Sequence, residues 1–254
     1  MISKNDLKYY SSLLIKKYRV QEEKFIVEGL KIVEEGLNSN YSNEVVFVTP
    51  LFADSFSEIV SVLKKKASTI IELKSSEFQR ISDTKAPQGI AAVFEKKYPK
   101  RKLTELKENI IVLIDNISDP GNLGTIIRTC DWFGLYNILI TNESVEYLNP
   151  KVLRSSMGSV FHLNIYDEVF ENDIINLKSE GYQIISSDIK GKNVFNFNPE
   201  AKSVLVFSNE SNGPSEMISE LADKTISIPG KGRAESLNVS SAAAIIISTV
   251  VNKL

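Results

Sequence analysis

The chain has 254 residues, of which 43% are apolar and 24% charged, and its formal net charge is -2. This length and composition predict one large or two ordinary folded domains and argue against a largely disordered protein. A single cysteine, Cys130, excludes an intrachain disulfide and a cysteine-rich zinc site, and a single histidine, His162, excludes a metal site built on two histidines. We therefore expect no bound metal.

No targeting or membrane segment is expected. The first residues lack a basic stretch followed by an apolar run. The longest apolar stretch, residues 242–251, is much shorter than the roughly 20 residues that span a bilayer. These features predict a cytoplasmic protein that does not bind membranes.

The charge is unevenly distributed along the chain. Residues 1–100 carry 16 Lys and Arg against 13 Asp and Glu, whereas residues 101–254 carry 14 against 19. Basic clusters occur at residues 16–19, 64–66 and 96–102. Such clusters can follow a phosphate backbone, although a solvated surface would show the same pattern.

Residues 1–97 predict a small α/β domain, because helical and strand-like patterns alternate along them. Helical patterns cover residues 6–18, 57–66 and 75–81, residues 25–30 lead into a helix that ends near Asn38, and strand-like patterns cover 45–48, 69–73 and 89–94. The basic stretch around Pro99 indicates a linker, which we place at residues 98–107.

Residues 108–254 predict a second α/β domain, with a mostly parallel sheet covered by helices on both faces. Strand-like runs cover residues 110–114, 137–141, 162–166, 183–187, 203–207 and 225–228, and helical patterns cover 122–133, 149–157, 172–179, 215–222 and 238–253. In this interpretation His162 is a packed residue at the start of a strand. Cys130 is a buried helix residue without chemistry.

Three loops that leave predicted strands carry most of the functional signal, because ligands of open α/β sheets bind at the carboxyl ends of the strands. In the first loop, residues 115–128, Pro120 and Gly121 force a turn. Asn122 can cap the following helix, and Arg128 can reach back to hold a phosphate or a carboxylate. A turn followed by a surface arginine is the simpler alternative for this loop alone.

The second and third loops are rich in small polar residues and glycine. In residues 208–215, small polar side chains surround one carboxylate, Glu210, and a helix-capping turn with Ser215 as the N-cap is the alternative. Residues 226–240 contain two glycines that let backbone amides approach a ligand closely. Neither a P-loop nor a dinucleotide fingerprint is present, which argues against a nucleotide-dependent oxidoreductase.

Taken together, residues 116–128, 209–213 and 228–240 resemble, in order and spacing, the three motifs of the SpoU/TrmH family, which are RNA ribose 2'-O-methyltransferases of the SPOUT superfamily. The resemblance covers residues 108–254. Residues 25–29 and 85–93 also resemble the small RNA substrate-binding domain that precedes the catalytic domain in many members. The resemblance implies a C-terminal trefoil knot, a homodimer formed through the knotted domain, and S-adenosylmethionine bound in a bent shape.

Carried over position by position, the resemblance places cofactor contacts at Ser208, Asn209, Glu210, Ile228 and Leu237, and functional side chains at Asn122, Arg128, Glu210, Ser236 and Asn238. Three positions depart from the family pattern: Ser208 and Ser211 replace frequent glycines, and Gly230 stands where methionine is usual. A non-catalytic RNA-binding protein with the same fold is therefore kept as an alternative.

The resemblance also bears on mechanism. Arg128 corresponds to the residue proposed as the base in the family, yet a guanidinium stays protonated at neutral pH and is a poor base. We expect Arg128 to hold an RNA phosphate and to stabilise the developing alkoxide, while a phosphate oxygen takes the proton. Glu210 is expected to orient an asparagine or the ribose, with helix capping as the alternative, and Ser236 is expected to cap the final helix.

The expected substrate is ribosomal RNA, with the large subunit favoured, because a separate N-terminal module with basic clusters resembles the arrangement of the ribosomal RNA enzymes of the family. Transfer RNA is the alternative substrate.

Overall fold

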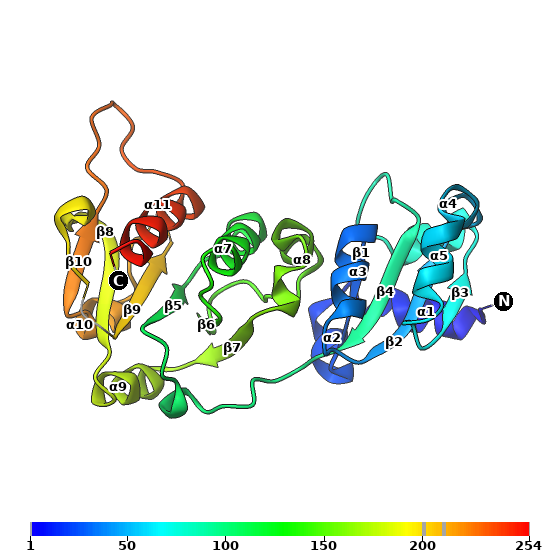
Figure 1. Cartoon of the computed structure of the whole chain (residues 1–254), viewed down its shortest axis with the longest axis horizontal. Helices are drawn as coiled ribbons and strands as arrows, with labels where there is room; N and C mark the ends of the chain where they lie inside the picture. The colour runs from blue at the N-terminus through cyan, green and yellow to red at the C-terminus, as the bar shows by residue number, and fades with distance from the viewer. Residues whose placement is uncertain (1, 200–201, 210–211, 254) are drawn as a thin grey trace. The chain divides into compact units, whose positions relative to one another are not determined.

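The computed structural model of the chain describes residues 2–199, 202–209 and 212–253. By their internal contacts these residues divide into two units (Figure 1). The first unit is drawn from residues 1–97 and 148–162, and the second from residues 98–147 and 163–254. No helix within the described ranges is long and apolar enough to cross a membrane.

The described part of the first unit contains a four-stranded sheet in the order β1-β4-β2-β3. Its strands are β1 (Lys24–Glu28), β2 (Asn43–Val48), β3 (Ile70–Glu72) and β4 (Ile90–Glu95). β4 pairs antiparallel with β1 and β2, and β2 pairs parallel with β3. The helices of this unit are α1 (Lys4–Ser12), α2 (Lys16–Glu22), α3 (Leu30–Asn38), α4 (Pro50–Ser55), α5 (Ser57–Leu63), α6 (Ser75–Ile81), α8 (Pro150–Ser156) and the 3-10 turn η2 (Ser159–Phe161).

Both faces of this sheet are covered, because consecutive residues of β2 and β4, whose side chains point to opposite faces, are buried. On one face, Phe47 of β2 and Phe78 of α6 are fully buried in a shared apolar cluster. On the other face, the ring of Phe161 lies 6.0 Å from that of Phe25 and 5.0 Å from that of Phe94, measured between centroids. The segment that contains α8 and η2 therefore contributes to the core of the first unit.

The described part of the second unit contains a six-stranded sheet in the order β10-β8-β9-β5-β6-β7, in which every pairing is parallel (Figure 1). Its strands are β5 (Ile110–Asp115), β6 (Asn137–Thr141), β7 (Asn164–Val169), β8 (Gln183–Asn193), β9 (Ser203–Ser208) and β10 (Lys224–Ser227). Its helices and 3-10 turns are η1 (Leu103–Glu105), α7 (Pro120–Trp132), α9 (Glu171–Ser179), η3 (Val194–Asn196), α10 (Glu216–Leu221) and α11 (Val239–Val251). The predicted α/β class and the predominance of parallel pairing are confirmed.

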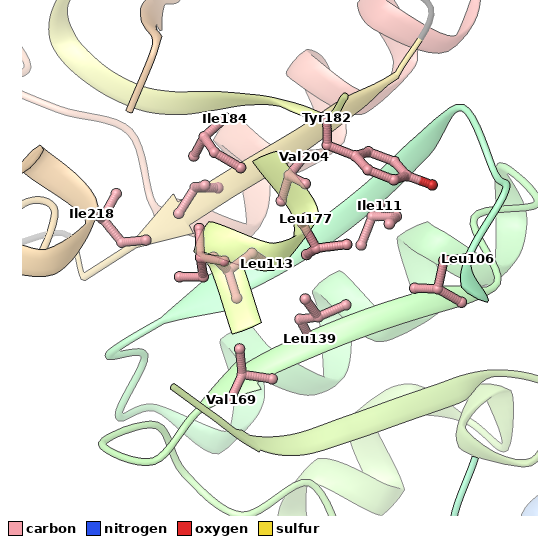
Figure 2. Packing of buried hydrophobic residues seen from close by; sticks show 12 residues of the cluster. Leu106, Ile111, Leu113, Leu139, Val169, Leu177, Tyr182, Ile184, Val204 and Ile218 are labelled. Carbon is pink, nitrogen blue, oxygen red and sulfur yellow. The ribbon is translucent and has the colours of Figure 1, made fainter. Parts of the chain in front are cut away.

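One face of this sheet packs against α9 and α10 in a single apolar cluster (Figure 2). Ile111 and Leu113 of β5 are fully buried there, beside Val204 of β9, Leu177 of α9 and Ile218 of α10. Truncating a large apolar side chain at such positions typically costs about 2–5 kcal/mol of unfolding free energy. This packing holds the central strands in register, so that their carboxyl ends lie side by side.

The predicted helix over residues 6–18 is two helices in the structure. α1 ends at Ser12, and Leu13 is fully buried instead of continuing the helix. The buried guanidinium of Arg19, on α2, donates a hydrogen bond of 2.9 Å to the carbonyl oxygen of Leu13. This bond satisfies a carbonyl group left free at the end of α1, which explains why the chain can break there without cost to a buried polar group.

Two further expectations differ from the structure. Residues 25–28 form part of β1, because their aromatic and β-branched side chains pair with β4, and α3 begins only at Leu30. His162 caps η2, and β7 begins at Asn164. The ring of His162 is exposed and its Nε2 lies 3.2 Å from Oε2 of Glu35, so the prediction of a packed histidine on a strand is wrong.

Candidate functional site

A cavity of about 790 Å³ lies in the second unit, at the carboxyl ends of β9 and β10 and beside the second half of β8. Residues 187–190 of β8, parts of the second and third loops, and the first turns of α11 line it. From the second loop these are Ser208, Asn209, Asn212 and Gly213, and from the third loop residues 226–232 and 234–237. Of the residues predicted to bind a cofactor, Ser208, Asn209, Ile228 and Leu237 line this cavity, as does Ser236. Glu210 and Ser211 lie outside the described residues.

Hydrogen bonds to the neighbouring strand fix the beginning of the second loop. Oγ of Ser208 donates to Oδ2 of Asp115 at 2.8 Å, and Nδ2 of Asn209 donates to the carbonyl oxygen of Asn116 at 3.2 Å. Asn116 adopts a left-handed conformation with φ of 57°, and its own amide donates to Oγ1 of Thr141 at 3.1 Å. The ends of β5, β6 and β9 are thereby connected through hydrogen bonds, and two of the bonded residues, Ser208 and Asn209, line the cavity.

Asp115 is a buried carboxylate that the sequence reasoning did not select. Its side chain is 0% exposed at the end of β5, and its Oδ2 accepts a second hydrogen bond from the amide of Ser215 at 2.8 Å. The signal was present in the sequence, since a continuous apolar run of strand length ends in an acidic residue. A carboxylate at the end of a buried strand needs hydrogen-bond donors from other segments.

A close backbone contact between β8 and β10 builds one wall of the cavity. The pairing of these strands jumps from Thr225 opposite Ser186 to Ile226 opposite Lys192, so residues 187–191 bulge out of the register. A Cβ atom at Gly191 would lie 2.4–2.6 Å from backbone atoms of Ile226, which leaves room only for glycine. The bulge brings residues 187–190 to the cavity.

The third loop leads into α11 through a cap different from the predicted one. Asn238 is the N-cap, and its Oδ1 accepts hydrogen bonds from the amides of Ser240 at 3.0 Å and Ser241 at 3.4 Å. The prediction that Ser236 caps this helix is therefore wrong. Nδ2 of Asn238 donates to Oδ1 of Asn122 at 2.9 Å, which joins the third loop to the first.

The predicted residues of the first loop, Asn122 and Arg128, do not line the cavity. Asp119, rather than Asn122, caps α7: its Oδ1 accepts from the amide of Asn122 at 2.9 Å. Arg128 lies further along α7 with an exposed side chain, and neither residue lines the cavity. The structure thus gathers five of the predicted residues around one cavity, pairs Asn122 with Asn238, and leaves Arg128 on the surface of α7.

The remaining reactive groups have no part in this site. Cys130 on α7 is fully buried, as predicted, and burial raises the pKa of its thiol. Within the described ranges, no group of three or more His, Cys, Asp or Glu residues is arranged to hold a metal ion. The cavity lining offers hydroxyls, amides and backbone groups, and also the charged side chains of Asp188, Lys190, Lys231 and Glu235.

Two family models match the chain. The model of the SpoU rRNA Methylase family matches residues 109–248, which include every residue that lines the cavity, and the model of the MRM3-like substrate binding domain matches residues 4–92.

Individual relatives match along nearly the whole length. The 23S rRNA (guanosine(2553)-2'-O)-methyltransferase RlmP of Bacillus subtilis is 32% identical over 242 residues, which cover 95% of this chain and 94% of that protein. An AdoMet-bound rRNA methyltransferase from Sinorhizobium meliloti is 26% identical, with a TM-score of 0.84 over 98% of this chain and 95% of that one. The SpoU methyltransferase AviRb from Streptomyces viridochromogenes shares the fold, with a TM-score of 0.89 at 24% identity over 99% and 98% of the two chains.

Proposed function

Because this chain belongs to the SpoU rRNA methylase family, we propose that it transfers the methyl group of S-adenosylmethionine to a ribose 2'-hydroxyl of large-subunit ribosomal RNA. The family, the enzyme class and the cofactor expected from the three loops are confirmed by the matches. The observation that carries the proposal for the site is the meeting of the predicted second and third loops at one cavity. The relative from Bacillus subtilis favours the 23S rRNA as substrate.

The cavity suits S-adenosylmethionine in size and chemistry. Its volume of about 790 Å³ falls within the roughly 300–1,000 Å³ typical of small-molecule and cofactor sites. Ile228 and Leu237 offer apolar surface, and Ser208, Asn209 and Ser236 offer polar groups. When bound, the cofactor supplies an electrophilic methyl group on a positively charged sulfur, and these residues would hold it.

We propose the remaining roles for Arg128, Asn122, Asn238 and Glu210, which are not among the residues seen to line the cavity. The exposed guanidinium of Arg128 can hold an RNA phosphate through paired N–H donors and stabilise negative charge on the reacting oxygen. The hydrogen bond between Asn122 and Asn238 fixes both amides, which can then orient the ribose. We also propose Glu210 as a group that orients these amides or the ribose.

We also propose a domain organisation and an oligomeric state for this chain. We propose residues 1–97 as an RNA substrate-binding domain, 98–107 as a linker and 108–254 as the methyltransferase domain with a trefoil knot. The matches to residues 4–92 and 109–248 support these bounds, although residues 148–162 belong to the first unit by their contacts. We further propose a cytoplasmic homodimer formed through the methyltransferase domain. Trp132, 85% exposed at the end of α7, and Tyr136, 54% exposed, support an apolar contact there. Sedimentation equilibrium of the wild type and of Trp132→Glu tests the dimer, and a monomeric wild type would contradict it.

The test of function uses the purified full chain with radiolabelled S-adenosylmethionine and, separately, deproteinised large-subunit rRNA and transfer RNA. We expect methyl incorporation into the large-subunit rRNA, with 2'-O-methylation mapped first at the position equivalent to guanosine 2553. Arg128→Lys is expected to bind the cofactor normally in calorimetry while its turnover falls about a hundredfold or more, because a bidentate contact is lost. Incorporation into transfer RNA alone would favour the alternative substrate, and absence of cofactor binding at millimolar concentration would favour a non-catalytic RNA-binding protein.

A further inference from the structure

The carboxylate of Asp115 is the most completely buried acidic group among the residues that the structure describes, and it lies behind the wall of the cavity. It is 0% exposed, and both of its hydrogen bonds use Oδ2, which accepts from Oγ of Ser208 and from the amide of Ser215, each at 2.8 Å. Ser208 lines the cavity, whereas Asp115 does not. One hydroxyl group therefore separates this carboxylate from the cavity.

The second carboxylate oxygen of Asp115, Oδ1, lowers the stability of the folded chain. Oδ1 is buried and has no hydrogen-bond partner among the described residues. A buried polar atom without a partner lowers stability, and the penalty is larger for a charged group. An uncharged side chain of similar size would avoid part of this cost, so stability alone does not explain the carboxylate.

The two donors of Asp115 bracket the second loop. Ser208 is the last residue of β9 and begins the loop, and Ser215 is the N-cap that ends it at α10. Between them, Asn209 and Gly213 are joined by a hydrogen bond of 2.9 Å from the amide of Gly213 to the carbonyl oxygen of Asn209, and both line the cavity. A single carboxylate oxygen thus clamps the loop at both ends onto β5.

We propose that Asp115 is a positioning residue for cofactor binding: it holds the two ends of the second loop, at Ser208 and Ser215, in the positions that receive S-adenosylmethionine, without touching the cofactor itself. This inference rests on the proposed function of the cavity. In this proposal, the affinity for the cofactor depends on the two charge-assisted hydrogen bonds that join Asp115 of β5 to the two ends of the loop. Removing the charge should loosen the loop and lower affinity, while the rest of the sheet stays folded.

The experiment measures cofactor affinity and loop protection in the full chain. Calorimetry with S-adenosylmethionine is expected to give a dissociation constant about tenfold or more higher for Asp115→Asn than for the wild type, because hydrogen bonds to a charged group are replaced by weaker neutral ones. Amide exchange followed by NMR is expected to show faster exchange at the amide of Ser215 in this variant. Ser208→Ala, which removes one donor only, should raise the dissociation constant less.

Asp223→Asn is the matched control. Oδ2 of Asp223 also accepts a backbone amide, that of Ile184 at 2.8 Å, and its Oδ1 pairs with Lys178, but none of these residues lines the cavity. This control is expected to change thermal stability without changing cofactor affinity or the exchange of the Ser215 amide.

The outcomes separate this inference from the proposed function. If the wild type binds no S-adenosylmethionine, the proposed function fails. If the wild type binds it and Asp115→Asn binds within twofold of the wild type, the positioning role is overturned. If Asp115→Asn does not fold, Ser208→Ala is the deciding variant. An unchanged dissociation constant, or a higher one without faster exchange at Ser215, overturns the proposal, and a higher one with faster exchange supports it.

Discussion

The amide of Asn238 performs two tasks with two different atoms, and a pair of substitutions separates them. Oδ1 caps α11 by accepting from the amides of Ser240 and Ser241, and Nδ2 donates to Oδ1 of Asn122. Asn238→Ala removes both interactions. Asn238→Asp keeps an acceptor for the cap but replaces the donor by a carboxylate oxygen that faces the oxygen of Asn122.

The expected magnitudes follow from these contacts. Loss of the cap in Asn238→Ala should cost about 1 kcal/mol, which lowers the melting temperature of a chain of this size by about 2–4 °C. In Asn238→Asp, a negative charge at the helix N-terminus contributes about 0.3–1 kcal/mol, which offsets the loss of one exposed hydrogen bond worth about 0.5–1.5 kcal/mol. Asn238→Asp should therefore melt close to the wild type, yet turn over about tenfold more slowly because Asn122 is no longer oriented.

Thermal melts followed by circular dichroism and single-turnover methylation with radiolabelled cofactor measure the two effects on the same samples. Asn122→Ala is the partner control and should lower turnover as much as Asn238→Asp does. Wild-type turnover by Asn238→Asp would refute the assignment of a positioning role to this hydrogen bond. A wild-type melting temperature for Asn238→Ala would refute the stabilisation of about 1 kcal/mol expected from the cap.

Three further predictions concern other parts of the chain. Gly191→Ala should lower both the melting temperature and the cofactor affinity, because its Cβ would collide with the backbone of Ile226 at the cavity wall; unchanged affinity in calorimetry would contradict this. A hydrogen bond from Lys31 holds the pKa of the Glu35 carboxyl below its ordinary value of 4.5. The resulting stabilisation is present at neutral pH and is lost as the pH falls through the folded-state pKa, so the stability difference between the wild type and Glu35→Gln should shrink in urea titrations below about pH 4.5. Cys130, buried with a raised pKa, should react with a disulfide reagent only after unfolding, and rapid labelling of the native protein would show that α7 opens.

The strands of the second unit could be predicted from sequence because burial on both faces leaves a continuous apolar run. β5 shows this, since all six of its residues, Ile110–Asp115, are buried. The general rule that ligands bind at the carboxyl ends of parallel strands then indicates the loops that follow β5, β9 and β10, of which the last two line the cavity. The strands and the loops that follow them could be predicted because they depend mainly on hydrophobic periodicity and turn-forming residues, which are local properties of the sequence.

The N-cap of α11 could not be predicted from local sequence preferences. Ser236 and Asn238 are both favourable N-cap residues, and their positions differ by only two. The structure selects Asn238, whose side chain also bonds to Asn122, a residue 116 positions earlier in the chain. Asp115 is a similar case, because its two donors lie 93 and 100 positions away. Contacts at such separations leave no periodic trace in one sequence.

The break between α1 and α2 has the same origin. The apolar residues around Leu13 continue a helical pattern, and nothing in their composition ends the helix. The end is set by the burial of Leu13 and by the bond from Arg19 to its carbonyl oxygen. A tertiary contact overrides local propensity there.

The contribution of Phe161 to the core of the first unit has a consequence for synthesis on the ribosome. After Lys97, chain elongation adds 64 further residues before His162, the last residue of that unit, is made. During this interval Phe25 and Phe94 lack the aromatic ring that covers them in the finished protein. The nascent N-terminal part therefore presents an unfinished apolar face while β5 and β6 are being translated, and its folding is completed only after the chain has begun the second unit.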